Sequence, residues 1–206
     1  MKNIVIFASG GGSNFKSIHR NIKSEKIFGQ IVLLVSNNFN SGAIKYAKNN
    51  NIGTFIIKNV KHPNTEIDED LLIKKLELVN TDLICLAGYV KLLPRKIVRK
   101  YKNCILNIHP SLLPRFGGKG FFGIKVHKAV IESGIKESGV TIHFVDEKYD
   151  SGKIITQEKV LVRNNYTPKI LSKKILEVEH ILYSKVVKAF CEDKFFWENN
   201  NPKIKH

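Results

Sequence analysis

Asn107 and His109 lie two residues apart in an apolar run that we expect to form a strand. Residues at this spacing in a strand point to the same side, so the amide and the imidazole share one face. Both groups can hydrogen-bond one oxygen atom, and histidine can also move a proton near neutral pH. The pair suits polarisation of a carbonyl group and stabilisation of an oxyanion. Pro110 ends the strand, and the proline- and glycine-rich loop that follows favours a functional site over a structural core histidine.

A carboxylate facing His109 would fix the tautomer of its imidazole and favour the charged form. The polar segment 146–152 carries three candidates, Asp146, Glu147 and Asp150, and periodicity does not choose among them. The same segment is also typical of a plain turn between two strands.

Three consecutive glycines, residues 10–12, lie between a predicted strand and a predicted helix. Glycines let the backbone approach a ligand, and the helix N-terminus offers free N–H groups, so the segment indicates an anion site. Ser13 and Asn14 follow without the lysine of a Walker motif, and Phe15 replaces the third glycine of a dinucleotide fingerprint. A phosphate monoester on a small substrate fits better than a nucleotide cofactor, and a structural turn is the alternative.

The other histidines and the cysteines carry weaker signals. His143 lies on a predicted strand and is a lesser candidate for lining the site, whereas His19 and His127 lie on predicted helices and are expected to be at the surface or half-buried. No HxH, HExxH or CxxC spacing occurs, so we expect no metal. The absence of a GxSxG segment argues against a serine nucleophile.

These residues are positioned by an alternation of short apolar runs with amphipathic segments. Continuous apolar strands joined by helices indicate a parallel sheet covered on both faces. The predicted strands span residues 4–8, 31–36, 54–57, 83–87 and 104–108. The predicted helices span residues 14–21, 42–50, 66–78 and 94–101. Ser41 is the predicted cap of the second helix, and Asn64 or Thr65 that of the third. Pro94 suits the first turn of the fourth.

The second half changes character after the loop 110–123. We expect a helix over residues 124–133, strands over 138–145 and 154–162, and a long helix from Pro168 to about residue 192 capped by Thr167. The fold class is therefore α/β, with an open, mostly parallel sheet, one antiparallel strand in the C-terminal half and a long C-terminal helix. We expect one domain over residues 1–198 and a frayed tail over 199–206.

Composition restricts the possible partners. The 206 residues include 43% hydrophobic ones, enough for a core without disulfides. The net charge of +16 is spread over both halves, and lysine and asparagine are both abundant, as AT-rich codon usage would produce. We therefore expect that nucleic acid is not a partner. No apolar run approaches the ~20 residues of a spanning helix, so we also expect no association with a membrane. The cysteines indicate reduced thiols, and the apolar run 4–8 is too short for a signal peptide, so we expect a cytoplasmic protein.

Five segments, in order along most of the chain, are similar to those of a known family. They are residues 9–14 (SGGGSN), 86–90 (LAGYV), 107–114 (NIHPSLLP), 139–145 (GVTIHFV) and 149–152 (YDSG). On these segments the chain resembles the phosphoribosylglycinamide formyltransferases, folate-dependent enzymes of purine biosynthesis with a Rossmann-like fold. The third segment is highly specific to formyl-folate enzymes, and the first is less specific by itself.

The resemblance implies a reaction and a set of site residues. It implies formyl transfer from 10-formyltetrahydrofolate, as a co-substrate, to the amine of 5'-phosphoribosylglycinamide through a tetrahedral intermediate, with no metal. Asn107, His109 and Asp150 would be catalytic, and the N-terminal half would bind the ribonucleotide. The ribonucleotide phosphate side would be held by Gly12, Ser13, Asn14 and Glu179. The folate would be held by Val90, Lys91, Leu92, Leu93, Asn107, Asp146, Glu147, Lys148 and Tyr149.

The sequence departs from the family pattern in two places. The family can carry a folate-binding arginine near the start of the third helix, where this chain has Thr65 and Glu66. The loop 115–123 is longer than in some relatives, and Lys119 is a candidate for replacing an anion contact.

Other functions compete with this interpretation. Methionyl-tRNA formyltransferase normally has a further C-terminal domain, for which this length leaves no room, and formyltetrahydrofolate hydrolase normally has an extra N-terminal one. A sugar-nucleotide formyltransferase tends to be longer. A non-catalytic RNA-binding module would show aromatic residues within a basic patch, and the densest basic stretch, 91–102, instead has the spacing of a solvated helix face. We expect small-molecule partners and a monomer or homodimer.

Overall fold

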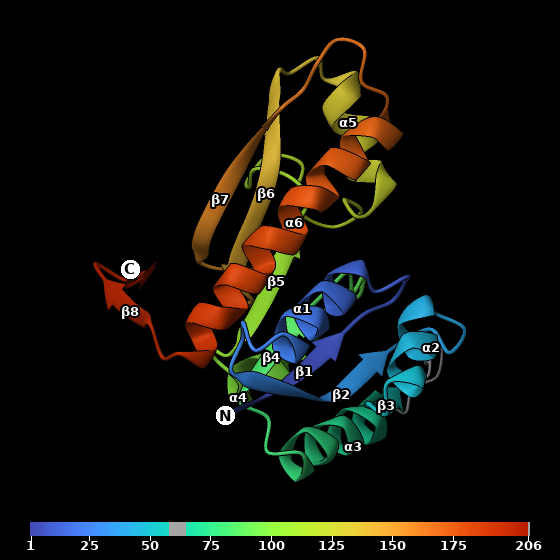
Figure 1. Cartoon of the computed structure of the whole chain (residues 1–206), viewed down its shortest axis with the longest axis vertical. Helices are drawn as coiled ribbons and strands as arrows, with labels where there is room; N and C mark the ends of the chain where they lie inside the picture. The colour runs from blue at the N-terminus through green and yellow to red at the C-terminus, as the bar shows by residue number, and fades with distance from the viewer. Residues whose placement is uncertain (58–64, 206) are drawn as a thin grey trace. The chain divides into compact units, whose positions relative to one another are not determined.

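The computed structural model describes residues 1–57 and 65–205, and the side chains of residues 65–68 are not described. The chain divides into two compact units, Met1–Leu106 and Asn107–His206. Among the described residues the strands form a seven-stranded sheet in the order β3-β2-β1-β4-β5-β6-β7 and a two-stranded sheet of β8 and β9 (Figure 1). The predicted fold class, an open and mostly parallel sheet with a long C-terminal helix, is confirmed.

The first unit is built on parallel strands. Strand β1 (Lys2–Phe7) pairs in parallel with β2 (Gly29–Ser36) and with β4 (Leu83–Leu86), and β2 pairs in parallel with β3 (Gly53–Ile56). Ile4, Ile6 and Phe7 are fully buried, as are most side chains of β4. The absence of inside–outside alternation confirms that this sheet is covered on both faces.

The helices of the first unit form two groups. Helix α1 (Ser13–Lys23) contacts α2 (Gly42–Asn49), and both pack on β2. Helix α3 (Thr65–Leu78) packs against α4 (Arg95–Lys100). Figure 1 shows α1 and α3 on opposite sides of β1 and β2. Right-handed crossovers require this, because the chain moves outward from β1 to β3 and then returns to β4 on the other side.

Two of the predicted caps can be checked in this unit. The Oγ of Ser41 accepts a hydrogen bond from the Ile44 N–H at 3.2 Å, which confirms Ser41 as the cap of α2. Pro94 is the N-cap residue of α4 and precedes its first turn, so its predicted place inside that turn is wrong by one residue. Asn64 and the side chain of Thr65, the other predicted cap, lie outside the described residues.

Strand β5 (Ile105–His109) carries the boundary between the two units, since its first two residues belong to the first unit. In the second unit, β6 (Glu137–Phe144) and β7 (Ile154–Leu161) pair in antiparallel fashion. Helix α6 (Pro168–Cys191) packs on both of these strands and on α5 (Ile124–Glu132). The Oγ1 of Thr167 accepts from the Ile170 N–H at 3.3 Å, so the predicted cap of the long helix is confirmed.

The described part of the C-terminal tail contains a strand over residues 201–204, where we expected frayed chain. Strand β8 (Phe195–Glu198) and β9 (Asn201–Ile204) form an antiparallel hairpin. Asn199 and Asn200 connect them with φ of 47° and 59°, the positive values that a tight hairpin turn needs and that asparagine tolerates. The rings of Phe195 and Trp197 both lie 5.7 Å from the ring of Phe144, which anchors the hairpin.

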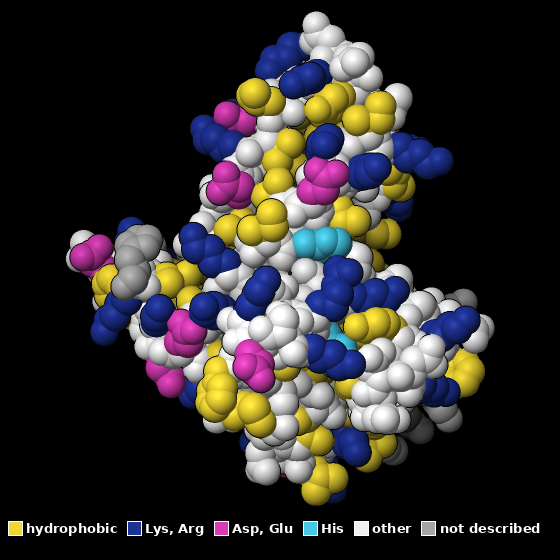
Figure 2. Space-filling view, in the orientation of Figure 1, with side chains coloured by type: hydrophobic (Ala, Val, Ile, Leu, Met, Phe, Trp, Pro, Cys, Tyr) yellow, Lys and Arg dark blue, Asp and Glu magenta, His cyan; other side chains and the backbone are white. Residues whose placement is uncertain are grey.

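In the described part of the chain, no helix combines the length and the apolar character needed to cross a membrane. On the face shown in Figure 2, lysine and arginine side chains are interspersed with apolar and acidic ones.

Candidate active site

Four polar side chains of the second unit meet at the end of β5. The Nδ2 of Asn107 lies 3.0 Å from the Nε2 of His143 on β6 and donates to the Oδ1 of Asp150 at 3.3 Å. The Nδ1 of His109 lies 3.5 Å from the Oδ2 of Asp150. Of the three carboxylates that the sequence leaves open, Asp150 therefore faces His109. We refer to Asn107, His109, His143 and Asp150 as the polar cluster.

The orientation of the Asn107 amide follows from His143. The Nδ1 of His143 lies 2.7 Å from the carbonyl oxygen of Phe144, which can only accept, so this nitrogen carries a proton. With the proton of the ring on Nδ1, the Nε2 is an acceptor, and the Asn107 NH₂ group faces it. Both Asn107 N–H groups are therefore used inside the polar cluster, and the bond to Asp150 is the longer one.

Asp150 is placed by the backbone. It has a φ of 53°, in the left-handed region that aspartate tolerates better than most residues, and its side chain is only 11% exposed. Its Oδ2 also accepts from the Gly118 N–H at 2.8 Å. Burial by itself would raise the pKa of Asp150, but the interaction with His143, the charge of His109 and the Gly118 N–H together hold that pKa below its usual value.

The imidazole of His109 lies between two acceptors. Its Nε2 is 2.8 Å from the carbonyl oxygen of Phe116, and its Nδ1 faces Asp150. Burial lowers the pKa of His109, and Asp150 and the Phe116 carbonyl oppose this shift. The neutral ring is thus the resting form near neutral pH, while two acceptors are in position for the N–H groups of the protonated ring.

The loop that supplies the Phe116 carbonyl is held by β6. The Oγ1 of Thr141 donates to the Ser111 carbonyl oxygen at 2.7 Å and accepts from the Leu113 N–H at 3.0 Å. The Oγ of Ser111 donates to the Arg115 carbonyl oxygen at 2.7 Å. Phe116 has a φ of 55°, which is uncommon for a bulky residue. The loop after β5 is therefore a fixed part of the site.

Two histidines differ from their predicted placement. His127 is 4% exposed and His19 is 8% exposed, so the expectation that both are at the surface or half-buried is wrong. His19 pairs with the Tyr46 hydroxyl at 3.0 Å. Burial, assisted by the charge of His109, lowers the pKa of His127 to about 4. The sequence does carry a signal for the burial of His127. At helical spacing His127 shares one face of α5 with Val126 and Val130, and all three are buried.

The glycine segment of the first unit has the geometry of an anion cradle. Gly12 is the N-cap of α1 with a φ of 69°, and nothing lies within 4 Å of a Cβ built on Gly10 or Gly11. At Gly12 such a Cβ would lie 2.9 Å from the Cβ of Ala43, so the close approach of α2 requires glycine here. Ser13 is half-buried and Asn14 is buried. The free N–H groups at the start of α1 suit a phosphate.

The residues predicted for the folate lie in both units. In the first unit the Val90 N–H donates to the Ser9 Oγ at 3.2 Å, Lys91 and Leu92 are exposed, and Leu93 is buried. In the second unit the Oδ1 of Asp146 accepts from the Lys148 N–H at 3.0 Å and from the Ser151 Oγ at 2.7 Å. Asp146 therefore organises the turn. Of the other predicted folate residues, Glu147 is half-buried and Tyr149 is exposed. Glu179, predicted on the ribonucleotide side, is buried on α6.

Thr65 and Glu66, the positions of the departure from the family pattern, have side chains outside the described residues. Within the described ranges, no group of three or more His, Cys, Asp or Glu side chains is arranged to hold a metal ion.

Comparison with known proteins shows the family of the chain. Residues 2–187 match the formyl transferase family. The chain belongs to the formyl transferase family. This confirms the resemblance seen in the five sequence segments.

Among individual formyl transferases, the chain is 46% identical to phosphoribosylglycinamide formyltransferase, chloroplastic, of Arabidopsis thaliana, over 97% of this chain and 68% of the relative. It thus spans about two thirds of that plant protein. It is 35% identical to phosphoribosylglycinamide formyltransferase of Bacillus subtilis, over 91% of this chain and 94% of the relative. The crystal structure of glycinamide ribonucleotide transformylase 1 from Symbiobacterium toebii superposes with a TM-score of 0.91 at 30% identity, covering 100% of this chain and 95% of that one.

Proposed function

We propose that this formyl transferase moves a formyl group from 10-formyltetrahydrofolate to the amine of 5'-phosphoribosylglycinamide, a step of purine biosynthesis. The observation that carries the proposal is the polar cluster, in which His109 lies between a carboxylate and a carbonyl beside the Asn107 amide. Relatives with this named activity support it, including one of similar length. The donor set also fits a formyl group, since an amide and an imidazole can both hydrogen-bond its oxygen.

The chain's own residues would act on the formyl oxygen as the substrate amine attacks. Asn107 and the protonated form of His109 stabilise the oxyanion of the tetrahedral intermediate. For this, the Nε2–H of His109 would leave the Phe116 carbonyl for the oxyanion while its Nδ1–H stays on Asp150. Asp150 orients the imidazole and supports its positive charge, and its ionised state follows from its lowered pKa. Proton transfer to the folate nitrogen, directly or through water, then lets the folate leave. No covalent bond to the enzyme forms.

Asn107 would exchange a partner in this step. In the described structure its two N–H groups bond to His143 and Asp150, and the bond to Asp150 is longer by 0.3 Å. We propose that Asn107 releases Asp150 and donates to the formyl oxygen, while His143 keeps the amide oriented. Asp150 retains the Gly118 N–H as a partner during this exchange.

Binding of the two substrates is assigned residue by residue. Gly12, Ser13 and Asn14 would hold the phosphate at the start of α1, with Glu179 on the ribonucleotide side. The folate would contact Val90–Leu93 and residues 146–149, largely through backbone groups. We propose that small molecules are the partners, that no metal takes part, and that the protein is cytoplasmic and monomeric or a homodimer, with residues 1–198 acting as one formyl transferase domain.

A direct assay tests the proposal. Purified protein is given 10-formyltetrahydrofolate with 5'-phosphoribosylglycinamide, and water and initiator tRNA serve as competing acceptors. We expect transfer to the ribonucleotide to dominate and to fall by about 10²–10⁴ in His109→Ala, with a substantial loss in Asp150→Asn. Lys169→Gln, an exposed change on α6, is the matched control. Hydrolysis or tRNA formylation as the dominant reaction, or near-unchanged turnover in both site variants, would overturn it.

A further inference from the structure

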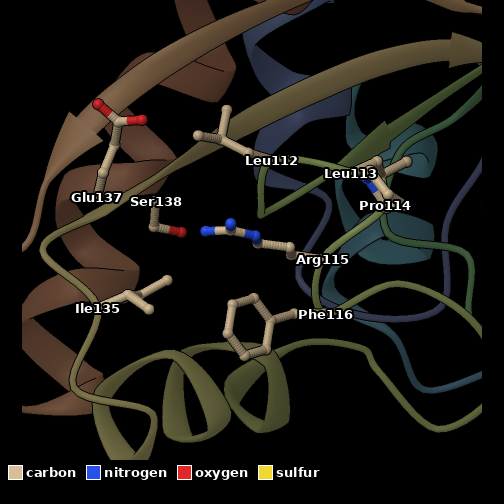
Figure 3. Close-up of a pocket in the computed structure, with 8 residues that line it drawn as sticks. All are labelled: Leu112, Leu113, Pro114, Arg115, Phe116, Ile135, Glu137 and Ser138. Atoms are coloured by element: carbon tan, nitrogen blue, oxygen red, sulfur yellow. The ribbon is translucent and has the colours of Figure 1, made fainter.

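The second unit contains a pocket of about 250 Å³ beside the loop that follows β5. It is lined by Leu112, Leu113, Pro114, Arg115, Phe116, Ile135, Glu137 and Ser138 (Figure 3). None of the polar cluster is among these lining residues, and no substrate contact was assigned to them above. The pocket is therefore separate from the polar cluster, and the proposed formyl transfer assigns it no role.

Two hydrogen-bond donors of the lining are aimed into the pocket. Ser138 is 2% exposed, and its hydroxyl has no hydrogen-bond partner in the described structure. Arg115 is exposed, and no ion pair or side-chain hydrogen bond joins its guanidinium to another described residue. Figure 3 shows the guanidinium and the hydroxyl pointing toward one another. A buried hydroxyl without a partner calls for a bound group, and a guanidinium beside it favours an anion.

The acidic residue of the lining does not cancel this preference. The carboxylate of Glu137 lies 3.1 Å from the Nζ of Lys159, so its charge is paired. Figure 3 shows that carboxylate directed away from Arg115. The positive charge of Arg115 therefore remains available to a ligand.

We propose that this pocket binds a small apolar monocarboxylate. The carboxylate would accept from the Arg115 guanidinium and the Ser138 hydroxyl, since a planar carboxylate matches the fork of an arginine. The apolar body would pack on Leu112, Phe116 and Ile135, and five of the eight lining residues are apolar. A cavity of about 150 Å³ admits benzene, so this volume holds an aromatic ring together with a carboxylate.

A ligand in this pocket would also touch the machinery of the polar cluster. Phe116 lines the pocket, and its carbonyl oxygen accepts the hydrogen bond from His109. Movement of Phe116 on binding would therefore change the surroundings of the His109 imidazole. The binding site itself stands independently of the proposed reaction.

Titration with benzoate, with benzamide as its neutral isostere, tests the proposal by calorimetry and by NMR of the histidine ring signals. We expect saturable binding of benzoate, at least about tenfold weaker binding of benzamide, and a perturbed His109 signal. Arg115→Gln should weaken benzoate binding at least about tenfold, and Ser138→Ala should weaken it too. Arg163→Gln, another exposed arginine of this unit outside the pocket, should leave the affinity unchanged.

Three results overturn the proposal. They are the absence of saturable benzoate binding, an equal affinity for benzamide, and an affinity for benzoate that Arg115→Gln does not change. Ser138→Ala removes only a hydroxyl from a buried position, so it keeps the test interpretable if Arg115→Gln is poorly folded. A benzoate affinity unchanged in Ser138→Ala would likewise contradict the proposed contact.

Discussion

The Nε2 of His109 lies 2.8 Å from the carbonyl oxygen of Phe116, seven residues further along the chain. A carbonyl only accepts, so this nitrogen carries a proton, and the Nδ1 on the other side of the ring faces Asp150 at 3.5 Å. The loop after β5 therefore sets the tautomer of the imidazole, and Asp150 decides how readily the ring takes up a second proton.

Replacement of Asp150 by asparagine should lower the pKa of His109 further. Burial already lowers that pKa, and the Asp150 carboxylate opposes the shift, so removal of the charge leaves only the Phe116 carbonyl to oppose it. An NMR titration of the His109 ring should show the protonated form appearing only at lower pH than in the wild-type protein. Asp146→Asn is the control, since among the described residues the Asp146 side chain bonds to Lys148 and Ser151 and not to His109. An unchanged or raised pKa in Asp150→Asn would contradict this account.

Replacement of His143 by phenylalanine should reduce kcat by about tenfold or more, with a smaller effect on KM. The variant removes the acceptor 3.0 Å from the Asn107 Nδ2, so the amide loses the contact that orients it. Thr156→Val, a half-buried change on the neighbouring strand β7, should leave kcat unchanged. Steady-state kinetics measure the effect. An unaltered kcat in His143→Phe would show that the orientation of the Asn107 amide does not depend on His143.

The buried imidazole of His127 should make the folded protein less stable in acid. Its pKa is about 4 in the folded state against about 6.5 for an unfolded chain, so the unfolded state binds more protons between these values. Stability should therefore fall as the pH drops from about 6.5 to about 4, by up to about 3 kcal/mol from this group. His109 and Asp150, whose pKa values are also lowered, act in the same direction.

Urea denaturation at several pH values measures the effect of His127. His127→Gln should flatten the dependence of the unfolding free energy on pH, whereas Lys128→Gln, its exposed neighbour on α5, should not. If the two variants lose stability in acid equally steeply, the lowered pKa of His127 is not the cause.

Replacement of Gly12 by alanine should destabilise the protein by about 1–2 kcal/mol, because its φ of 69° is unfavourable for other L-residues. The added Cβ would also approach that of Ala43 at 2.9 Å and disturb the start of α1. We expect a raised KM for the ribonucleotide as well as the lower stability, measured by thermal unfolding and steady-state kinetics. Gly10→Ala, with nothing within 4 Å of the added Cβ, is the matched control for stability. Equal stability of the two variants would contradict the requirement for glycine at position 12.

Local sequence determined most of the fold and half of the polar cluster. The period of a strand places Asn107 and His109 on one side of β5 wherever that strand lies, and the continuous apolar runs indicate a doubly covered parallel sheet. Cap residues such as Ser41 and Thr167 mark helix starts through contacts three residues away. These signals are local, so no knowledge of distant segments is needed to interpret them.

Apart from Asp150, which the family resemblance also indicates, only the tertiary structure decided which distant groups meet this pair. Three carboxylates were available in residues 146–152, and the φ of Asp150 together with its bond to the Gly118 N–H selects one of them. The register of β6 brings His143 to Asn107, and the backbone path of the loop brings the Phe116 carbonyl to His109. A backbone carbonyl has no signature in the sequence, and the burial of His127 depends on packing between segments far apart in the chain. Periodicity tells which way a side chain points, and only the packed structure tells what it faces.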